Sequence, residues 1–307
     1  MTNAMKHLSI ILAAAAALAL LPACSTPLQT TTQTNNRTSS QAKTTPAPKS
    51  RRFPPVEQQG NIAIVAHRGF WNCEAGGWSE NSIASLKAAQ DAGLWGSEFD
   101  IHITSDDVVI VNHNASINGK RIANHRFSDF AGDLLPNGER RPTLDEYLTQ
   151  AAKCTTTKII VELKPQGSEA REDVMVAKTI EAIKAHGLYD PERVLFISFS
   201  RHICDLIAEG HPQFVNQFLS TNFVKNENPE LYAERGINGV DYHYKMFSIR
   251  PEYVSKAHEL GMSVNAWTVD NDADIKEMIN VGVDAITTNN PLRVRELLGN
   301  KEFKKKL

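Results

Sequence analysis

Short apolar runs alternate with amphipathic stretches through most of this chain. After residue 60, eight runs have the length and composition of buried strands, and six longer stretches have the spacing of amphipathic helices. The expected strands lie near 62–66, 96–100, 159–163, 194–198, 214–219, 238–242, 263–267 and 284–287, and the expected helices near 82–92, 144–153, 170–186, 251–260, 271–281 and 291–298. Strands that alternate with helices are typical of repeated β-α-β units. Eight of them predict an α/β fold, a closed (β/α)8 barrel of the TIM type.

A ninth apolar run, 108–111, does not fit this count. Only residues 104–107 separate it from the preceding strand, whereas a parallel crossover needs about a dozen residues. We therefore expect an antiparallel β-hairpin that turns near Ser105 and Asp106 and brings His113 roughly opposite Glu98. The segment 114–142 has several glycines and prolines with weak periodicity, so we expect a small insertion at the barrel mouth.

Two helix starts are marked in the sequence. Thr143 is followed three positions later by Glu146, which is the spacing of a capping box. The first helix begins at Glu80-Asn81-Ser82, and an N-cap role for Asn81 is the simplest explanation of its asparagine.

The first residues have the pattern of a bacterial export signal. Lys6 precedes an apolar stretch from Leu8 to Leu21, and Ala23-Cys24 follows shortly afterwards. The stretch is too short for a comfortable membrane span. We interpret residues 1–23 as a lipoprotein signal peptide and Cys24 as the lipid-bearing residue, with an ordinary signal peptide as the alternative. Ser25 after that cysteine favours the outer membrane of the cell envelope, facing the periplasm or the surface.

Composition divides the remaining chain. Residues 24–56 are rich in Thr, Ser, Gln, Asn and Pro and almost lack large apolar side chains, so they predict a disordered tether. Residues 57–307 then form the barrel domain, held at a membrane by the lipid anchor. A formal net charge of -2 gives no basic face, so nucleic acid is not an expected partner. With Cys24 lipidated, Cys73, Cys154 and Cys204 allow at most one intramolecular disulfide.

Chemically reactive side chains follow four of the apolar runs. They are His67-Arg68-Gly69, Glu98-Phe99-Asp100, His113 and Glu162-Leu163-Lys164. Barrel enzymes keep their chemistry at the carboxyl ends of the strands, and residues two apart on a strand share a face. Three carboxylates, from Glu98, Asp100 and Glu162, are therefore expected to converge. Oxygen ligands of this kind predict a divalent metal, Ca2+ or Mg2+; the alternative is a set of solvated loop acids.

The same residues fit the cleavage of a phosphodiester, which is anionic and needs neutralisation, a base and an acid. Arg68 and Lys164 would bind the phosphate, and His67 and His113 would move protons. Taken singly, His67 could be a core histidine and His113 a surface residue of the hairpin. Their joint placement favours function.

In this order the set resembles the glycerophosphodiester phosphodiesterase family, which has a His-Arg-Gly opening, a Glu-Asn, a Glu-x-Asp pair, a second His and a Glu-x-Lys. The resemblance runs from about Ile62 to the segment 282–288. It implies that the two histidines act as acid and base and that Trp267, in Ala266-Trp267-Thr268-Val269, packs against the substrate; a barrel-core tryptophan is the alternative. Asn114 replaces the usual Asp after the second histidine, which puts the usual glycerol recognition in doubt.

We therefore expect a lipid-anchored, metal-dependent hydrolase that converts glycerophosphodiesters, its small-molecule substrates, to sn-glycerol 3-phosphate and an alcohol. One alternative is a phospholipase D-like lipid phosphodiesterase of the sphingomyelinase D type, which typically has Asp at the position of Glu162. The other is a non-catalytic envelope lipoprotein that binds a phosphorylated ligand.

Overall fold

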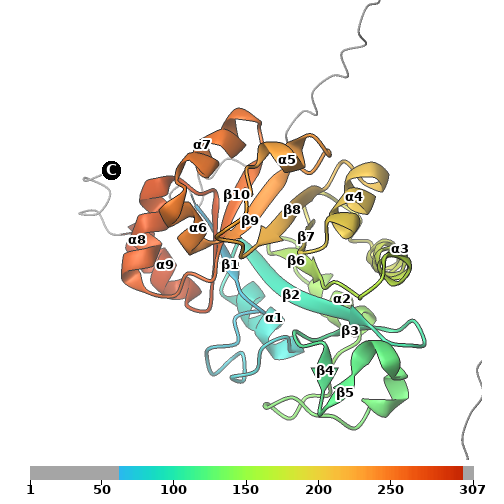
Figure 1. The fold of residues 1–307 in the computed structure, drawn as a ribbon. Coiled ribbons are helices and arrows are strands. Elements are labelled where there is room, and N and C mark those ends of the chain that lie inside the picture. Colours follow the sequence, from blue (N-terminus) through green and yellow to red (C-terminus); the bar gives the residue numbers. More distant parts are fainter. Residues whose placement is uncertain (1–61, 300–307) are drawn as a thin grey trace, which may run out of the picture. The chain divides into compact units, whose positions relative to one another are not determined.

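Eight parallel strands close into a barrel in this computed structural model, which describes residues 62–299 (Figure 1). The barrel strands are β1 (Ala63–Ala66), β2 (Gly96–Ile103), β6 (Lys158–Leu163), β7 (Val194–Ser198), β8 (Val215–Ser220), β9 (Gly239–His243), β10 (Ser263–Trp267) and β11 (Ala285–Thr288). Each pairs with its neighbour in this order, and β1 pairs with both β11 and β2, which closes the ring. The expected signal peptide, the tether and Cys24 lie outside the described residues.

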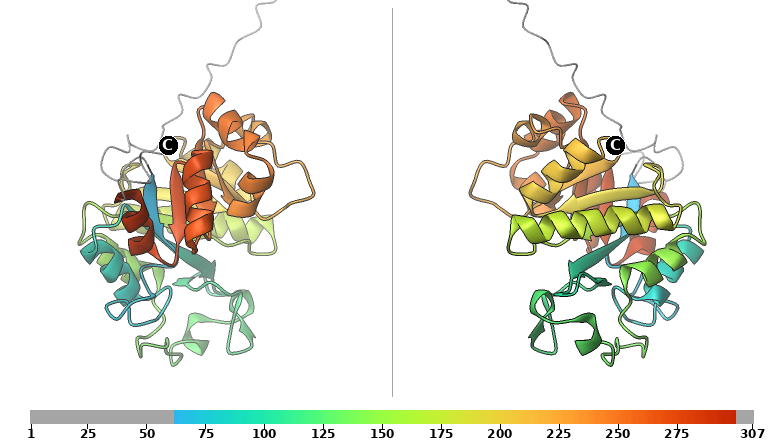
Figure 2. Two further views of the ribbon diagram at one scale, coloured as in Figure 1. Left: turned by 90° about the vertical axis from the view of Figure 1, so that its left-hand side faces the viewer. Right: turned by 90° about the vertical axis from the view of Figure 1, so that its right-hand side faces the viewer.

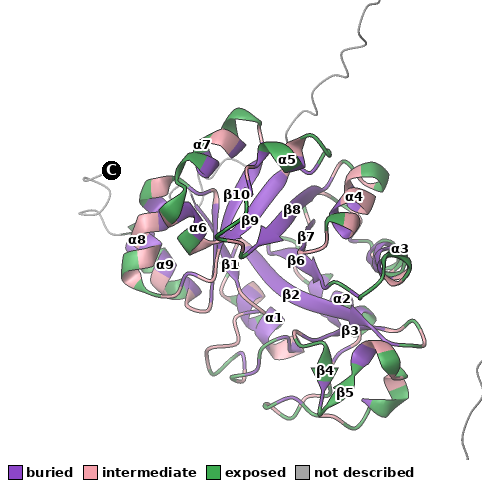
Figure 3. Ribbon diagram, viewed as in Figure 1, coloured by how far each residue is buried: buried purple, intermediate pink, exposed green. Residues whose placement is uncertain are grey.

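Helices surround the strands on the outside of the barrel (Figure 2). They are α1 (Ile83–Asp91), α2 (Leu144–Ala151), α3 (Glu169–Ala185), α4 (Arg201–Gly210), α5 (Glu230–Ala233), α6 (Tyr244–Ile249), α7 (Glu252–Glu259), α8 (Asp272–Val281) and α9 (Pro291–Gly299). Their inner faces are buried and their outer faces exposed, while the strands are buried along nearly their whole length (Figure 3). This is the burial expected of a parallel sheet covered by helices.

Alternate residues of each strand lie in different environments, as the pleat requires. Ile64 belongs to a large apolar cluster that includes residues of α7, α8 and α9. Val65 instead joins a smaller cluster whose fully buried members all come from strands, among them Ile160 of β6. This smaller cluster is the interior of the barrel. A Cβ on Gly96 would meet Ile160 and Val65, so the face of β2 that carries Gly96 also points inward.

The ninth strand is antiparallel, as expected. In β3 (Val109–Val111), Val111 lies opposite Ile101 of β2. The backbone N–H of Thr104 donates to the carbonyl of Val108 at 3.0 Å across the turn. Extending this register places residue 113 opposite residue 99, one position from the expected partner Glu98.

The insertion at 114–142 is small and has its own apolar centre. It contains β4 (Ser116–Ile117), β5 (Lys120–Arg121) and the 3-10 helices η2 (Ile122–Asn124) and η3 (Phe127–Asp129). Ile117, Ile122 and Phe130 pack with Ile110 of β3. Glu139 accepts hydrogen bonds from the backbone N–H groups of the first two residues of α1, at 2.9 and 3.1 Å. The insertion therefore lies at the mouth, where α1 begins.

All eight predicted barrel strands and all six predicted helices are confirmed, while α4, α5 and α6 were not predicted. The capping box of α2 is confirmed, with Thr143 accepting from the backbone of Glu146. The predicted N-cap of α1 is wrong. Ser82 caps that helix through its hydroxyl, because Asn81 adopts a left-handed backbone with φ 57° and turns its side chain elsewhere.

Cys73, Cys154 and Cys204 are free thiols in the described structure, so the disulfide that the sequence allowed is not formed among them. Within residues 62–299, none of the helices has the length and apolar character needed to cross a membrane.

Candidate active site

The barrel brings the predicted groups from three adjacent strands to one end of the sheet. β2 lies between β1 and β6, and Asp100 of β2 pairs in register with Glu162 of β6. Glu98 and Asp100 share the inward face of Gly96, and Glu162 shares the inward face of Ile160. His67 follows β1 and His113 follows β3. The predicted carboxylates therefore point toward the barrel axis at the mouth.

The three carboxylates form a tight, buried cluster. Glu98, Asp100 and Glu162 are 2%, 1% and 7% exposed, and one ligand oxygen from each lies within 4.8 Å of the others. Lys164 Nζ lies 2.7 Å from Asp100 Oδ1 and 2.6 Å from Glu162 Oε1. Glu98 Oε2 accepts a hydrogen bond from the Arg68 backbone N–H at 2.7 Å, but Glu98 Oε1 has no partner in the described structure. The alternative of solvated acids is excluded by this burial.

Burial and mutual repulsion act on the carboxyl groups unequally. Burial, followed by the charges of Asp100 and Glu162, raises the pKa of Glu98 well above its ordinary value. Burial and then Asp100 raise the pKa of Glu162 to about 8. The pKa of Asp100 is also pushed up by burial, but Lys164, His113 and Asn81 together outweigh this and hold it below its ordinary value. The cations beside the cluster therefore do not neutralise all three carboxylates. A divalent cation that prefers oxygen ligands would supply the missing positive charge.

Arg68 is fixed by a left-handed turn directly after β1. Its φ is 55°, and its guanidinium donates to Glu80 Oε2 at 2.6 Å and has its Nε 3.7 Å from Asp100 Oδ2. Gly69 follows with φ +81°, and a Cβ there would lie 2.2 Å from the hydroxyl of Ser85. Only glycine fits this close approach. The turn aims the Arg68 backbone N–H at Glu98 and its side chain at the acids.

Asn81 belongs to the site, as the family resemblance allowed, although a helix cap was the simplest interpretation of the sequence. Its amide Nδ2 donates to Asp100 Oδ2 at 2.8 Å, and its Oδ1 accepts from the Asp100 backbone N–H at 3.1 Å. Its own backbone N–H donates to the carbonyl of Arg68 at 2.9 Å. Asn81 thus ties the loop after β1 to the acid on β2. The Glu-Asn pair was the available signal for this role.

His67 is partly exposed and is held by groups at the end of β11. Its Nδ1 lies 2.9 Å from Asn289 Oδ1, at the end of β11, and its backbone N–H donates to the carbonyl of Thr288 at 3.0 Å. Burial and then the positive charge of Arg68 lower the pKa of His67 to about 4. Its imidazole is therefore neutral at pH 7 and able to accept a proton.

His113 is also partly exposed and lies within electrostatic reach of the acids. Its Nδ1 lies 3.1 Å from Asn114 Oδ1. Burial lowers its pKa, the nearby Asp100 opposes this, and Lys164 adds to it. Its carbonyl oxygen lies 3.2 Å from Nε2 of the buried His102.

Aromatic side chains line the other half of the rim. Trp267 ends β10, is partly exposed and donates from Nε1 to the carbonyl of Asp241 at 3.0 Å. Its ring meets Phe199 and His243 edge-on, with centroids 5.6 and 5.8 Å apart. Phe223 continues the row at 5.5 Å from His243. The acids lie on β2 and β6 and these rings follow β7 to β10, so the two sets occupy different arcs of one mouth.

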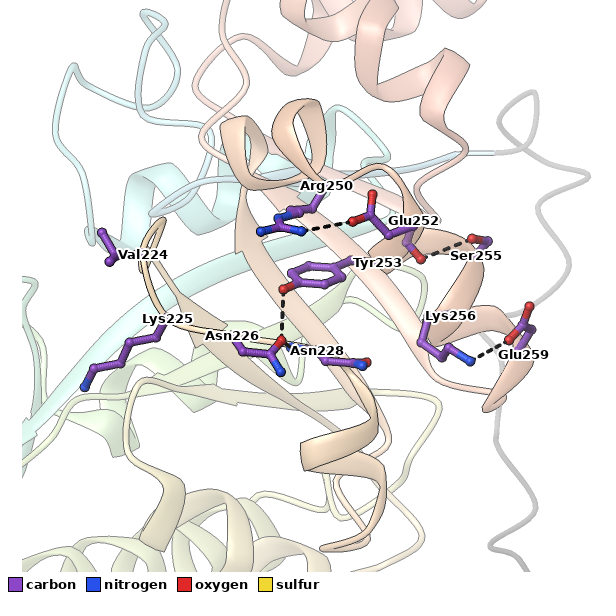
Figure 4. Close-up of a pocket in the computed structure, with 10 residues that line it drawn as sticks. All are labelled: Val224, Lys225, Asn226, Asn228, Arg250, Glu252, Tyr253, Ser255, Lys256 and Glu259. Carbon is purple, nitrogen blue, oxygen red and sulfur yellow. Dashed lines mark hydrogen bonds and ion pairs between the residues drawn. The ribbon is translucent and has the colours of Figure 1, made fainter.

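The pocket shown in Figure 4 is separate from this site. It is lined by Val224, Lys225, Asn226, Asn228, Arg250, Glu252, Tyr253, Ser255, Lys256 and Glu259. Several of these side chains are already paired with one another, as in the 2.9 Å contact of Lys256 with Glu259. None of the predicted site residues lines it.

Residues 67–293 match the glycerophosphoryl diester phosphodiesterase family. The chain belongs to this family. A glycerophosphodiester phosphodiesterase of Caldanaerobacter subterraneus subsp. tengcongensis is 26% identical over 241 residues, which cover 74% of this chain and 94% of the relative. One of Bacillus altitudinis is 27% identical over 250 residues, 76% of this chain and 98% of its own.

Solved structures agree with this assignment. A glycerophosphodiester phosphodiesterase from Parabacteroides distasonis matches with a TM-score of 0.73 and 36% identity, covering 78% of this chain and 97% of its own. A phosphodiesterase from Oleispira antarctica, solved in complex with the product sn-glycerol-3-phosphate, has the same fold, with a TM-score of 0.66, 21% identity, and coverage of 78% of this chain and 97% of its own. The protein is an enzyme of this class, a phosphoric diester hydrolase.

Proposed function

We propose that this enzyme hydrolyses glycerophosphodiesters to sn-glycerol 3-phosphate and an alcohol, and that the reaction depends on a divalent metal. The observation that carries the proposal is the convergence of three buried carboxylates, two cations and two histidines at one barrel mouth. Membership of the family supports the substrate class, and the product complex of the Oleispira antarctica relative supports sn-glycerol 3-phosphate as the product.

The donor set fits a hard divalent cation, Ca2+ or Mg2+. Glu98, Asp100 and Glu162 would hold it, and the unpartnered Glu98 Oε1 would gain a partner. Three carboxylates that otherwise resist ionisation together can all be charged around such an ion. When bound, the metal supplies Lewis-acid polarisation of the phosphoryl oxygen.

The remaining residues have distinct roles toward the phosphate. Arg68 presents a planar fork of donors suited to two phosphate oxygens, and Lys164 adds a point charge beside the acids. One of the histidines His67 and His113 accepts a proton of the attacking water. The other donates a proton to the alcohol as its bond to phosphorus breaks.

The aromatic arc would contact the organic parts of the substrate. Trp267 offers a partly exposed ring at the rim, and apolar contact with a glycerol or head group is a common use of such a surface. Asn114 and the insertion replace the family's usual sequence after the second histidine. The head group that this enzyme prefers is therefore to be established by assay rather than by analogy.

Of the alternatives, the sphingomyelinase D type is less well supported. The third carboxylate is Glu162, held beside Lys164 at 2.6 Å, and the matched relatives described above are glycerophosphodiester phosphodiesterases. A non-catalytic lipoprotein would have no need to keep both histidines and all three acids in this arrangement.

We also propose that the enzyme is exported and anchored to the cell envelope through a lipid on Cys24, as its first residues suggest. Metabolic labelling with a radioactive fatty acid tests this. The full chain should incorporate label and the Cys24→Ala variant should not; equal labelling of both would reject the anchor.

The proposed activity is tested by measuring metal dependence on defined substrates. The enzyme should release glycerol 3-phosphate from glycerophosphodiesters with Ca2+ or Mg2+ and not with EDTA. Glu181→Gln, on the exposed face of α3, is the matched control for acid substitutions and should behave as the parent. Release of a cyclic phosphate from a lyso-lipid, with no turnover of glycerophosphodiesters, would favour the sphingomyelinase D alternative instead.

A further inference from the structure

Asn289, directly after β11, makes hydrogen bonds through its backbone N–H and through both ends of its side-chain amide. Its amide Nδ2 donates to Asp270 Oδ2 at 2.8 Å, and its backbone N–H donates to Asp270 Oδ1 at 2.8 Å. Its Oδ1 accepts from Trp71 Nε1 at 3.0 Å and lies 2.9 Å from His67 Nδ1. Asp270 Oδ1 also accepts from the hydroxyl of Thr288 at 3.0 Å. One amide therefore joins the loop after β10 to the first histidine.

These partners determine which way the Asn289 amide points. A carboxylate only accepts hydrogen bonds, so the atom facing Asp270 must be the amide nitrogen. An indole nitrogen only donates, so the atom facing Trp71 must be the amide oxygen. Asparagine orientation is normally assigned from its hydrogen-bond network, and here two independent partners give the same answer.

The amide orientation in turn decides the tautomer of His67. The atom beside His67 Nδ1 is an acceptor, so Nδ1 must carry a proton and donate it. In a neutral imidazole the other nitrogen, Nε2, then holds the lone pair. Arg68, Glu80 and Asp100 are the charged groups that act on this ring, which places it within electrostatic reach of the acids.

We propose that Asn289, held by Asp270, is a positioning residue that fixes His67 in the tautomer protonated at Nδ1. This inference rests on the proposed hydrolysis and assigns roles within it. His67 is the base: Nε2 takes a proton of the attacking water while the water oxygen bonds to phosphorus. The bond from phosphorus to the leaving alcohol breaks, and His113 donates the proton that the departing oxygen needs.

The tautomer is measured directly by NMR of the full-length protein with 15N-labelled histidine. Protonated and unprotonated ring nitrogens have well-separated 15N shifts, and His67→Gln identifies the signals of His67. We expect Nδ1–H with Nε2 bare in the parent at neutral pH. A parent signal with the proton on Nε2 would overturn the inference, whether or not any variant folds.

Variants test the cause of the tautomer. Asn289→Leu removes the acceptor and should lose the preference for Nδ1–H, and kcat should fall about 10- to 100-fold while KM changes little. Trp71→Phe removes the other donor to the same oxygen and should keep the Nδ1–H tautomer. An unchanged tautomer and kcat in a folded Asn289→Leu variant would contradict the proposal.

An exchange of the two side chains provides the rescue. In the double variant Asp270→Asn with Asn289→Asp, the new amide at position 270 donates to the new carboxylate at position 289, which reverses the original hydrogen bond. The carboxylate at position 289 still accepts from His67 Nδ1. We expect it to restore the Nδ1–H tautomer and most of kcat relative to Asn289→Leu. A double variant no better than Asn289→Leu would reject the role of the acceptor. A parent that turns over no glycerophosphodiester would reject the proposed function separately, because the NMR result does not depend on turnover.

Discussion

Replacing Glu98 with glutamine should make the metal-free protein more stable while it abolishes activity. Glu98 is 2% exposed, its Oε1 has no partner in the described structure, and two other carboxylates repel it. Glutamine has the same shape, and its amide oxygen can still accept the hydrogen bond from the Arg68 backbone. The substitution therefore removes the repulsion and the buried charge without opening a cavity.

The size of this gain follows from the raised pKa of Glu98. In the unfolded chain a carboxyl group of ordinary pKa 4.5 is ionised at pH 7, whereas the raised pKa favours the protonated form of Glu98 in the folded, metal-free protein. This difference costs about 1.4 kcal/mol per pH unit, so its upper limit at pH 7 is roughly 3 kcal/mol. The folded pKa is the higher one, so this cost shrinks as the pH falls from 7 toward 4.5. For a domain of this size the limit corresponds to a Tm increase of roughly 6–12 °C.

The assay is thermal unfolding in EDTA and in Ca2+ at several pH values. In EDTA at pH 7 the Glu98→Gln variant should have a higher Tm than the parent, and this difference in Tm should be smaller at pH 5. Ca2+ should raise the Tm of the parent and leave the variant unchanged. The exposed Glu181→Gln variant should follow the parent throughout. A variant with a lower Tm than the parent in EDTA, or with as large a Tm increase from Ca2+ as the parent, would show that Glu98 neither destabilises the metal-free protein nor binds the ion.

Three further predictions concern the pH dependence, the second histidine and the turn after β1. Glu162, with a pKa of about 8, is mostly protonated at pH 7, so metal binding should release a proton. Titration calorimetry in buffers of different ionisation enthalpy should show this release. A heat of binding that does not depend on the buffer would contradict it. The kcat of His113→Ala should fall roughly 10²- to 10⁴-fold on an alkyl glycerophosphodiester. It should fall much less on a nitrophenyl ester, whose leaving group needs no proton. An equal fall in kcat on both substrates would show that His113 is not the acid. Gly69→Ala should lower the free energy of unfolding by about 1–3 kcal/mol because of its left-handed backbone alone, and by more because of the close contact with Ser85. Denaturant unfolding measures this, and an unchanged free energy of unfolding would contradict the contact with Ser85.

The sequence was sufficient for the barrel and for the acids because both depend on local patterns. Apolar runs of four to eight residues and helical spacing identify the strands regardless of what they pack against. Once the strands are parallel, Glu98, Asp100 and Glu162 must meet at one end. The hairpin followed from chain length alone, since four residues cannot make a parallel crossover.

Side-chain partners across the fold could not be predicted in this way. Asn81 looked like a helix cap because the residue type favours caps, but its left-handed backbone turns the amide toward Asp100. Asn289 lies 222 positions from His67, and only the closure of β11 onto β1 brings the two together. A polar run after the last strand was the available signal, and it does not identify a partner.

We propose that phosphodiester hydrolysis requires a metal held by the three acids. The decisive measurement is the release of sn-glycerol 3-phosphate from a panel of glycerophosphodiesters by the purified full chain, with Ca2+, Mg2+ or EDTA, beside the His67→Ala and Glu98→Gln variants. We predict metal-dependent release by the parent, none in EDTA, and loss of release in both variants. Release that continues unchanged in EDTA, or in the Glu98→Gln variant, would contradict the account.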